Sequence, residues 1–251
     1  MDSMVIEYII LALLSFVAGG LTLFTGFGLS TILLPVFMIF LPATIAVPST
    51  AIVHFLNNFY KLSIYFKKID IKVLLRFGVP ALLAAVGGAL LLNKLSSNER
   101  SLEILLGILI ISIAFLEMLP FVKKLTIDLK WAPVGGVISG FFGGLSGHQG
   151  LFRSAFLLKS GLNKTSFIAT GVGIAVLVDI TRLSVYGSTL FTTSIISTQN
   201  FWLPVIISTA SALFGVSLAS DLVKKMTIDL IRNMVYVFIF VTGVLLILGK
   251  I

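Results

Sequence analysis

SGFFGGLSGHQGLFR, from Ser139 to Arg153, interrupts a long apolar run with five glycines. Glycine costs about 1 kcal/mol relative to alanine in a helix interior, so this density predicts either a broken helix or a very close backbone approach. Inside a membrane, irregular backbone persists only where it is buried in protein or lines a wet cavity. The stretch therefore indicates a binding site, with helix packing through small residues as the alternative. His148, Gln149 and Arg153 within it favour the site.

The composition is that of a membrane protein. Of the 251 residues, 58% are hydrophobic and 11% are charged, against about 25% charged residues in soluble domains. The mean hydropathy is +1.13, and runs of about 20 apolar residues recur, which predicts an all-α, multi-pass protein of the plasma membrane. The N-terminal MDSMVIEYII has no basic region, so we interpret it as part of a first transmembrane helix rather than a signal peptide.

Apolar segments divide this single transmembrane domain, 1–251, into two halves of five. The first half covers about 4–119 and the second about 132–249, with 119–132 as the joint. The expected segments are 4–25, 29–41, 43–66, 73–92, 102–119, 132–147, 150–158, 165–187, 201–220 and 231–249. Segments 29–41 and 150–158 are short for a full crossing. The sequence leaves open whether they span the membrane or re-enter it as half-helices.

The two halves resemble copies of each other at a shift of 121 residues. A weaker glycine-rich break, AGGLTLFTGFGLSTILLP from Ala18 to Pro35, then falls on the stretch that begins at Ser139. Matches among polar residues and glycines carry the argument, because matches among apolar residues arise by chance. These matches pair Gly19 with Gly140, Gly26 with Gly147, Ser49 with Thr170, Asn58 with Asp179, and Lys61 with Arg182. We expect an internal repeat.

The basic residues predict how the copies are oriented. The loop after segment 43–66 is rich in lysine, whereas its counterpart, 187–200, has no charge. With the first loop in the cytoplasm, twelve basic residues lie inside and three outside, a clear positive-inside bias that also accounts for the net charge of +8 without nucleic acid. An odd number of segments per copy then predicts two inverted repeats, with half-helices near the midplane and both termini outside.

Several motifs resemble the TauE/SafE sulfite exporter family. The resemblance covers nearly the whole chain as a pattern of glycines and apolar runs, and Phe27, His148 and Gln149 stand where that family tends to have further glycines. The motifs are GFGLSTILLP (26–35), AVPSTA (46–51), the run at 86–89, LLGILIISIA (105–114), GGVISGFFGGLSGHQG (135–150) and ATGVG (169–173). The resemblance implies a secondary transporter, and an exporter, of small sulfur-containing anions.

Physical reasoning from the residues also favours an anion site. A helix broken near the midplane presents free N–H groups and a positive dipole end, to which Arg153 would add a charge-assisted contact. Lys61 and Arg182 have an alternative role, since they could extend to the lipid headgroups. The expected substrate-binding residues are Gly26, Gly28, Ser49, Thr50, His54, Asn57, Gly147, His148, Gln149, Gly150, Arg153 and Thr170.

Coupling and competing functions follow from the titratable residues. His54, His148 and Asp179 are the candidates for proton coupling, and sodium bound by unwound backbone carbonyls is the alternative. No metal or other cofactor is expected. An enzyme is disfavoured because the chain has two histidines, no cysteine and no paired carboxylates in its apolar segments. An anion channel, a permease for another solute and a non-transporting membrane subunit stay open, as does the oligomeric state.

Overall fold

The computed structural model describes residues 3–22, 29–119, 127–187, 199–222 and 228–251. This part of the chain is all-helical and contains no strand, which confirms the predicted class. The helices match the ten segments expected from the sequence. They are α1 (Ser3–Leu21), α2 (Leu29–Phe40), α3 (Ala43–Tyr65), α4 (Ile71–Leu95), α5 (Glu99–Met118), α7 (Ala132–Ser146), α8 (Gly150–Leu157), α9 (Lys164–Gly187), α11 (Gln199–Leu222) and α12 (Ile228–Leu248).

Length and hydropathy together distinguish the helices that could cross a membrane from the short ones. Among the described helices, α1, α4, α5, α9 and α11 are long and apolar enough to cross a membrane. In contrast, α2 has 12 residues and α8 has 8. At 1.5 Å per residue they extend about 18 and 12 Å, well short of the ~30 Å hydrocarbon core. These two helices are therefore half-helices.

The short helix α8 folds back along α7. Gly135, at the start of α7, lies against the ring of Phe156, at the end of α8. The backbone N–H of Ile127, which precedes α7, donates to the carbonyl of Ala155 at 3.1 Å. Because these contacts join the start of α7 to the end of α8, the two helices form a hairpin that enters and leaves at the same end. This hairpin is the path expected of a re-entrant segment, so re-entry of segment 150–158 stays a prediction.

The first half contains a similar hairpin. A small cavity between α1 and α2 is lined by Tyr8 and Leu11 of α1 and by Phe37 and Phe40 of α2. The beginning of α1 therefore lies beside the end of α2, and α2 runs back along α1. Re-entry of segment 29–41 is a prediction for the same reason as that of segment 150–158.

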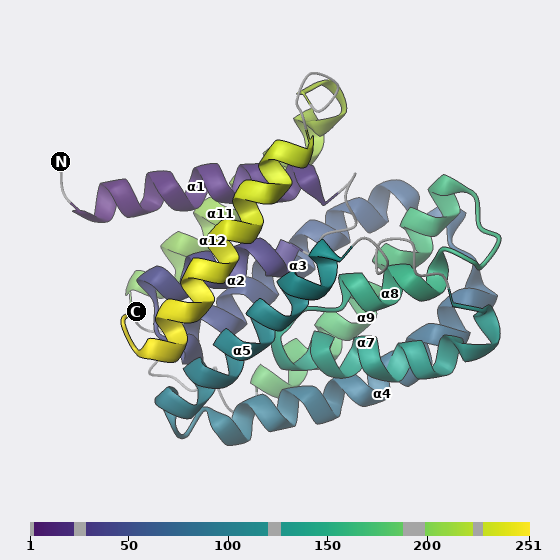
Figure 1. Ribbon diagram of the computed structural model, residues 1–251. Helices are drawn as coiled ribbons and strands as arrows, with labels where there is room; N and C mark the ends of the chain where they lie inside the picture. The colour runs from purple at the N-terminus through teal and green to yellow at the C-terminus, as the bar shows by residue number, and fades with distance from the viewer. Residues whose placement is uncertain (1–2, 23–28, 120–126, 188–198, 223–227) are drawn as a thin grey trace.

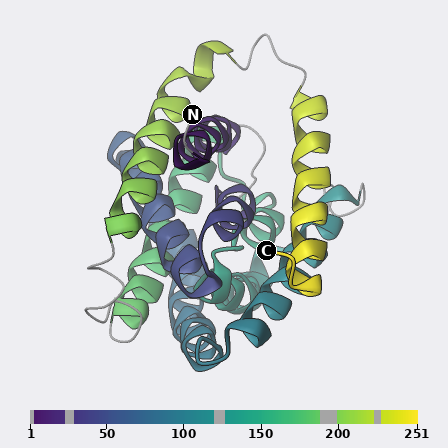
Figure 2. The same cartoon turned by 90° about the vertical axis from the view of Figure 1, so that its left-hand side faces the viewer.

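Helices that the 121-residue shift relates have related neighbours. Helix α7 packs along α4, and α1 packs along α11, whereas α3 packs on α9 in the centre and α5 packs on α12 (Figures 1 and 2). Shifting α3 by 121 places it on 164–186, within one residue of the bounds of α9. This pairing agrees with an internal repeat. The inversion of one copy relative to the other stays a prediction.

Glycines bring α7 into backbone contact with α4, and the two helices run side by side in Figure 1. Gly140 and Gly144 lie one turn apart on α7. A Cβ on either would overlap the backbone carbonyl of Ala81 or Ala85 on α4. Close approach through small residues is the packing mode that apolar helices use in lipid. Part of the glycine pattern is thus explained by packing, as the alternative interpretation held, and the rest by the break after Ser146.

The re-entrant hairpin makes a prediction for accessibility labelling. The chain has no cysteine, so single cysteines at Lys130, Lys159 and Ser97 can be labelled with an impermeant maleimide. We expect Lys130→Cys and Lys159→Cys to react from the same face of the membrane, because α7 and α8 return to the end where they begin. Ser97→Cys should react from the other face, since α5 crosses between Ser97 and Lys130.

Lys68→Cys is the matched control, because α4 and α5 together return the chain to the face of Lys68. Lys68→Cys should react with the maleimide from the same face of the membrane as Lys130→Cys. Reaction of Lys130→Cys and Lys159→Cys from opposite faces would contradict the re-entrant hairpin.

Candidate anion-binding site

The break between α7 and α8 is a left-handed turn. Helix α7 ends at Ser146, and Gly147 follows with φ = 85°, a conformation that glycine adopts without strain. The N–H of Gly147 donates to the carbonyl of Gly143 at 2.9 Å. Tyr186 of α9 donates its hydroxyl proton to the carbonyl of Gly144 at 2.5 Å. A side chain from a neighbouring helix thus satisfies backbone that the break leaves open, as irregular backbone in a membrane requires.

His148 and Gln149 occupy the turn itself, and both are buried. His148 Nδ1 lies 2.9 Å from the hydroxyl oxygen of Ser146, whereas its Nε2 has no partner among the described residues. The carbonyl of Gln149 accepts a hydrogen bond from Ser139 at 2.9 Å. The side-chain Oε1 of Gln149 accepts a hydrogen bond from Arg153 at 3.2 Å, and the amide Nε2 has no partner in the described chain.

A charged cluster joins α3 to α9 next to this turn. His54 Nδ1 lies 2.7 Å from Asp179 Oδ2, and Asn58 Nδ2 lies 3.4 Å from the same carboxylate oxygen. Arg182 donates through Nε to the other oxygen, Oδ1, at 3.0 Å. Asp179 and Arg182 are both 0% exposed. Two residues that the repeat relates by 121 positions, Asn58 and Asp179, thus meet at the contact between α3 and α9.

The two other basic residues of the interior lie apart from this ion pair. Lys61 is buried and donates from Nζ to the hydroxyl of Thr22 at 2.5 Å. Arg153 is half-buried on α8, and its Nε faces Gly171 of α9. Neither has a carboxylate within ion-pair distance in the described chain. Arg182 and Lys61 are enclosed by protein, so the headgroup interpretation does not describe them.

Several buried polar atoms at the turn and on α3 have no hydrogen-bond partner in the described part of the chain. Fully buried polar groups normally make hydrogen bonds, because a buried group without one lowers the stability by about 1–3 kcal/mol. Such atoms therefore mark a place where a polar ligand or water fits. They are Ser30 Oγ, Ser49 Oγ, both amide atoms of Asn57, His148 Nε2, Gln149 Nε2 and Arg182 Nη1.

The remaining expected site residues have other positions. The hydroxyl of Thr50 donates to the carbonyl of Ala46 within its own helix at 2.8 Å. Thr170 accepts a hydrogen bond from the backbone N–H of Asp70 at 2.9 Å, which ties α9 to the start of α4. Gly150 begins α8 and is buried. Gly26 and Gly28 lie outside the described residues.

Sequence reasoning left three residues out of the candidate site, namely Ser30, Asn58 and Arg182. Ser30 lies in the apolar helix α2, where nothing in the local pattern distinguishes its hydroxyl. Asn58 and Arg182 were noticed on their helices but not assigned to the site. The signal that could have found them is the repeat, since Asn58 matches Asp179 and Lys61 matches Arg182. Polar residues that recur at equivalent positions of two copies are expected where the copies meet.

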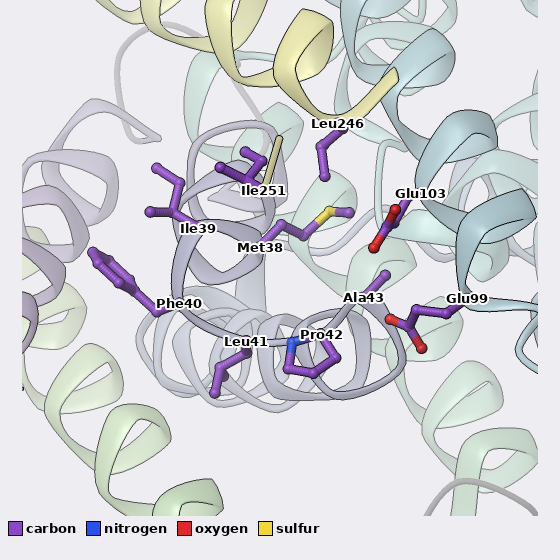
Figure 3. Close-up of a pocket in the computed structure, with 10 residues that line it drawn as sticks. All are labelled: Met38, Ile39, Phe40, Leu41, Pro42, Ala43, Glu99, Glu103, Leu246 and Ile251. Carbon is purple, nitrogen blue, oxygen red and sulfur yellow. The ribbon is translucent and has the colours of Figure 1, made fainter. Parts of the chain in front are cut away.

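A second hollow is unsuited to an anion. It has a volume of about 370 Å³, lies where α2 meets α3, and is lined by Met38 to Ala43, Leu246, Ile251 and the carboxylates of Glu99 and Glu103 (Figure 3). Glu99 accepts a hydrogen bond from the N–H of Thr44 at 3.2 Å, and Glu103 pairs with Arg100. Two carboxylates would repel an anion. No group of three His, Asp or Glu side chains suited to a metal occurs among the described residues.

Short half-helices that meet a buried polar cluster within an apolar bundle are typical of a class of protein, that of the polytopic membrane transporters. The chain belongs to the sulfite exporter TauE/SafE family, whose model matches residues 11–246. The resemblance inferred from the sequence motifs is thereby confirmed. In the corresponding comparisons, no curated protein and no solved structure matched the chain. The family is one of membrane anion exporters, so membership supports a transporter rather than an enzyme.

Proposed function

We propose that this protein is a secondary transporter that exports small sulfur-containing oxyanions, such as sulfite or sulfonates, across the plasma membrane by alternating access. The observation that carries the proposal is the set of buried polar atoms without partners at the α7–α8 turn, on Ser30, His148, Gln149 and Arg182. Most of them can donate a hydrogen bond, and the basic residues Lys61, Arg153 and Arg182 outnumber Asp179, the acid of the α3–α9 cluster. An anion gains from both properties, because its desolvation has to be offset by several converging donors.

The short helix α8 adds to the attraction for an anion. Its first N–H groups have no partner within the helix, and Gln149 makes no side-chain cap there. The helix dipole also favours negative charge at this end. Arg153, one turn further along α8, donates to Gln149 and is the residue that we expect to hold the oxyanion with Gly147, His148, Gln149 and Gly150.

Proteoliposomes that contain the purified protein test the proposed function. A carrier should give saturable sulfite flux that depends on an applied gradient. Ohmic anion current would instead indicate a channel. Neither flux nor current for sulfite, sulfonates or other small solutes would contradict a transport function and favour a non-transporting subunit.

Arg153→Gln is expected to weaken sulfite binding by roughly one to two decades. The reason is the loss of a charge-assisted hydrogen bond, which contributes about 1.5–3 kcal/mol. Arg153→Lys should recover binding only in part, because the ammonium lacks the planar fork of the guanidinium. Binding is measured by titration calorimetry in detergent, with the exposed Lys68→Gln as the control. Sulfite affinity equal to that of the parent would remove Arg153 from the site.

Any proton coupling is proposed to run through His54, His148 or Asp179. The contact of 2.7 Å between His54 and Asp179 supports the first and the third, since a proton can move along it. Asp179 also faces Arg182, so its charge is already balanced in part. We expect His54→Gln to flatten the dependence of sulfite flux on pH between about pH 5 and 8, where histidine titrates.

His148→Gln and Asp179→Asn complete this series of single replacements. If flux through all three variants keeps the parental pH profile, proton coupling through these residues is excluded. Dependence of flux on sodium, with carbonyls of the unwound backbone as ligands, would then be the coupling to test.

A further inference from the structure

Arg182 is an unusual guanidinium because it is completely enclosed and only partly paired. Its Nε donates to Asp179 Oδ1 at 3.0 Å, and its Nη2 lies 2.8 Å from the same oxygen. The other carboxylate oxygen, Oδ2, faces His54 and Asn58 instead. Asp179 therefore holds one edge of Arg182, and the guanidinium also contacts the Tyr186 hydroxyl. By hydrogen-bond geometry, its Nη1 has no partner among the described residues.

The free edge of Arg182 is directed at the α7–α8 turn. A Cβ added to Gly147 would overlap two atoms at once, Arg182 Nη1 and the hydroxyl oxygen of Ser30. These two atoms thus approach Gly147 from different helices, α9 and α2, and meet there. Only because Gly147 has no side chain can these two atoms approach the turn so closely.

The groups that meet at this turn share one chemical property. Arg182 Nη1 can only donate, and Ser30 is 0% exposed with a hydroxyl that has no partner in the described chain. The ring of His148, next in sequence to Gly147, also has an unpartnered nitrogen. The neighbouring hydroxyl of Tyr186 is engaged with the carbonyl of Gly144. A ligand with several acceptor oxygens and a negative charge satisfies this set.

We propose that Arg182 binds the transported oxyanion through Nη1, with Ser30 and the Gly147 turn as the other walls of the site, and that Asp179 competes with the anion for Arg182. This inference rests on the proposed function and names the residue at which the substrate is held. It differs from a purely structural role for Arg182, in which the guanidinium would serve only to neutralise Asp179.

Competition has a consequence that a structural ion pair does not share. The carboxylate of Asp179 lowers the positive potential that Arg182 offers to an incoming anion. Removing this carboxylate should therefore tighten anion binding, whereas removing the guanidinium should weaken it. Asp179→Asn and Arg182→Gln thus have opposite expected effects on affinity, although each breaks the same ion pair.

The test measures sulfite binding to the purified full-length protein in detergent, by calorimetry and by the rise in the unfolding temperature that sulfite causes. Asp179→Asn should bind sulfite about ten-fold more tightly than the parent. Asp179→Asn combined with Arg182→Gln removes both charges together and should bind at least ten-fold more weakly than the parent. Ser30→Ala, a small change without charge, should weaken binding several-fold.

The outcomes separate this inference from the proposed function. If the parent binds sulfite and the doubly substituted protein binds it with equal affinity, the role of Arg182 is overturned and the proposed function stands. Absence of sulfite binding and flux in the parent would overturn the proposed function and this inference with it. If Asp179→Asn does not fold, the comparison of the neutral double variant and Ser30→Ala with the parent decides the matter.

Discussion

Asp179→Asn alone should lower the stability of the anion-free protein by about 3–5 kcal/mol, because it leaves the guanidinium of Arg182 buried without a counter-charge. Both partners are 0% exposed, so water cannot solvate the remaining charge. The measurement is thermal unfolding of the purified protein in detergent without sulfite. Adding sulfite should restore part of the loss, since a ligand that binds only the folded state stabilises it.

The chain contains a matched control for this prediction. Arg100 and Glu103 form another ion pair at the same i, i+3 spacing, with a contact of 3.1 Å, but the Arg100 side chain is 45% exposed. Exposed pairs contribute about 0–1 kcal/mol, so Glu103→Gln should hardly change the unfolding temperature. Replacing Asp179 and Arg182 together should lower the stability less than Asp179→Asn alone. If Asp179→Asn and Glu103→Gln have equal, small effects on the unfolding temperature, the expected cost of breaking the buried pair is wrong.

Gly88→Ala is the second substitution with a large expected effect. A Cβ at this position of α4 would overlap the backbone carbonyl of Phe141 on α7. Backbone cannot rotate away as a side chain does, so the two helices have to separate, at a cost of about 1–3 kcal/mol or more for overpacking. Because α7 carries the turn at Gly147, we expect sulfite flux to fall as well. Unfolding temperature and flux are the two measurements.

Gly87→Ala tests whether the loss at Gly88 comes from the helix contact. Gly87 is the preceding residue of the same helix, and a Cβ there would meet nothing within 4 Å. Alanine also favours a helix over glycine by about 1 kcal/mol. Gly87→Ala should therefore be neutral or slightly stabilising. A loss of stability at Gly87 as large as that at Gly88 would show that the α4–α7 contact is not its cause.

The membrane class and the segment boundaries could be predicted from the sequence, because both depend on local hydropathy. An apolar run long enough to cross the bilayer becomes a helix whatever its neighbours are, since lipid cannot satisfy its backbone. The break at Gly147 was also predictable, since glycine density within an apolar run is a local signal. The family was predictable for a similar reason, as its motifs are themselves runs of glycine and apolar residues.

The structure places the candidate site residues in different surroundings. His148 and Gln149 are at the break, and His54 and Asn57 are buried in α3. In contrast, Thr50 and Thr170 use their hydroxyls within α3 and at the start of α4. A hydroxyl in a helix can bond to its own backbone or to a neighbour, and the choice depends on which way the helix is rotated. Hydropathy does not specify that rotation for an almost wholly apolar helix.

The sequence by itself determined an all-helical membrane protein of the TauE/SafE family with a glycine break in its second half. Only the tertiary structure decided that α8 folds back along α7 and α2 along α1, because a short apolar helix is compatible with a returning or a continuing path. It also decided that Arg182 faces Asp179 and the turn at Gly147 rather than the headgroups. Asp179 meets His54 across 125 residues of chain, and this contact depends on how α3 packs on α9. Local sequence patterns fix where helices begin and end, whereas contacts between helices arise from the packing of the whole bundle.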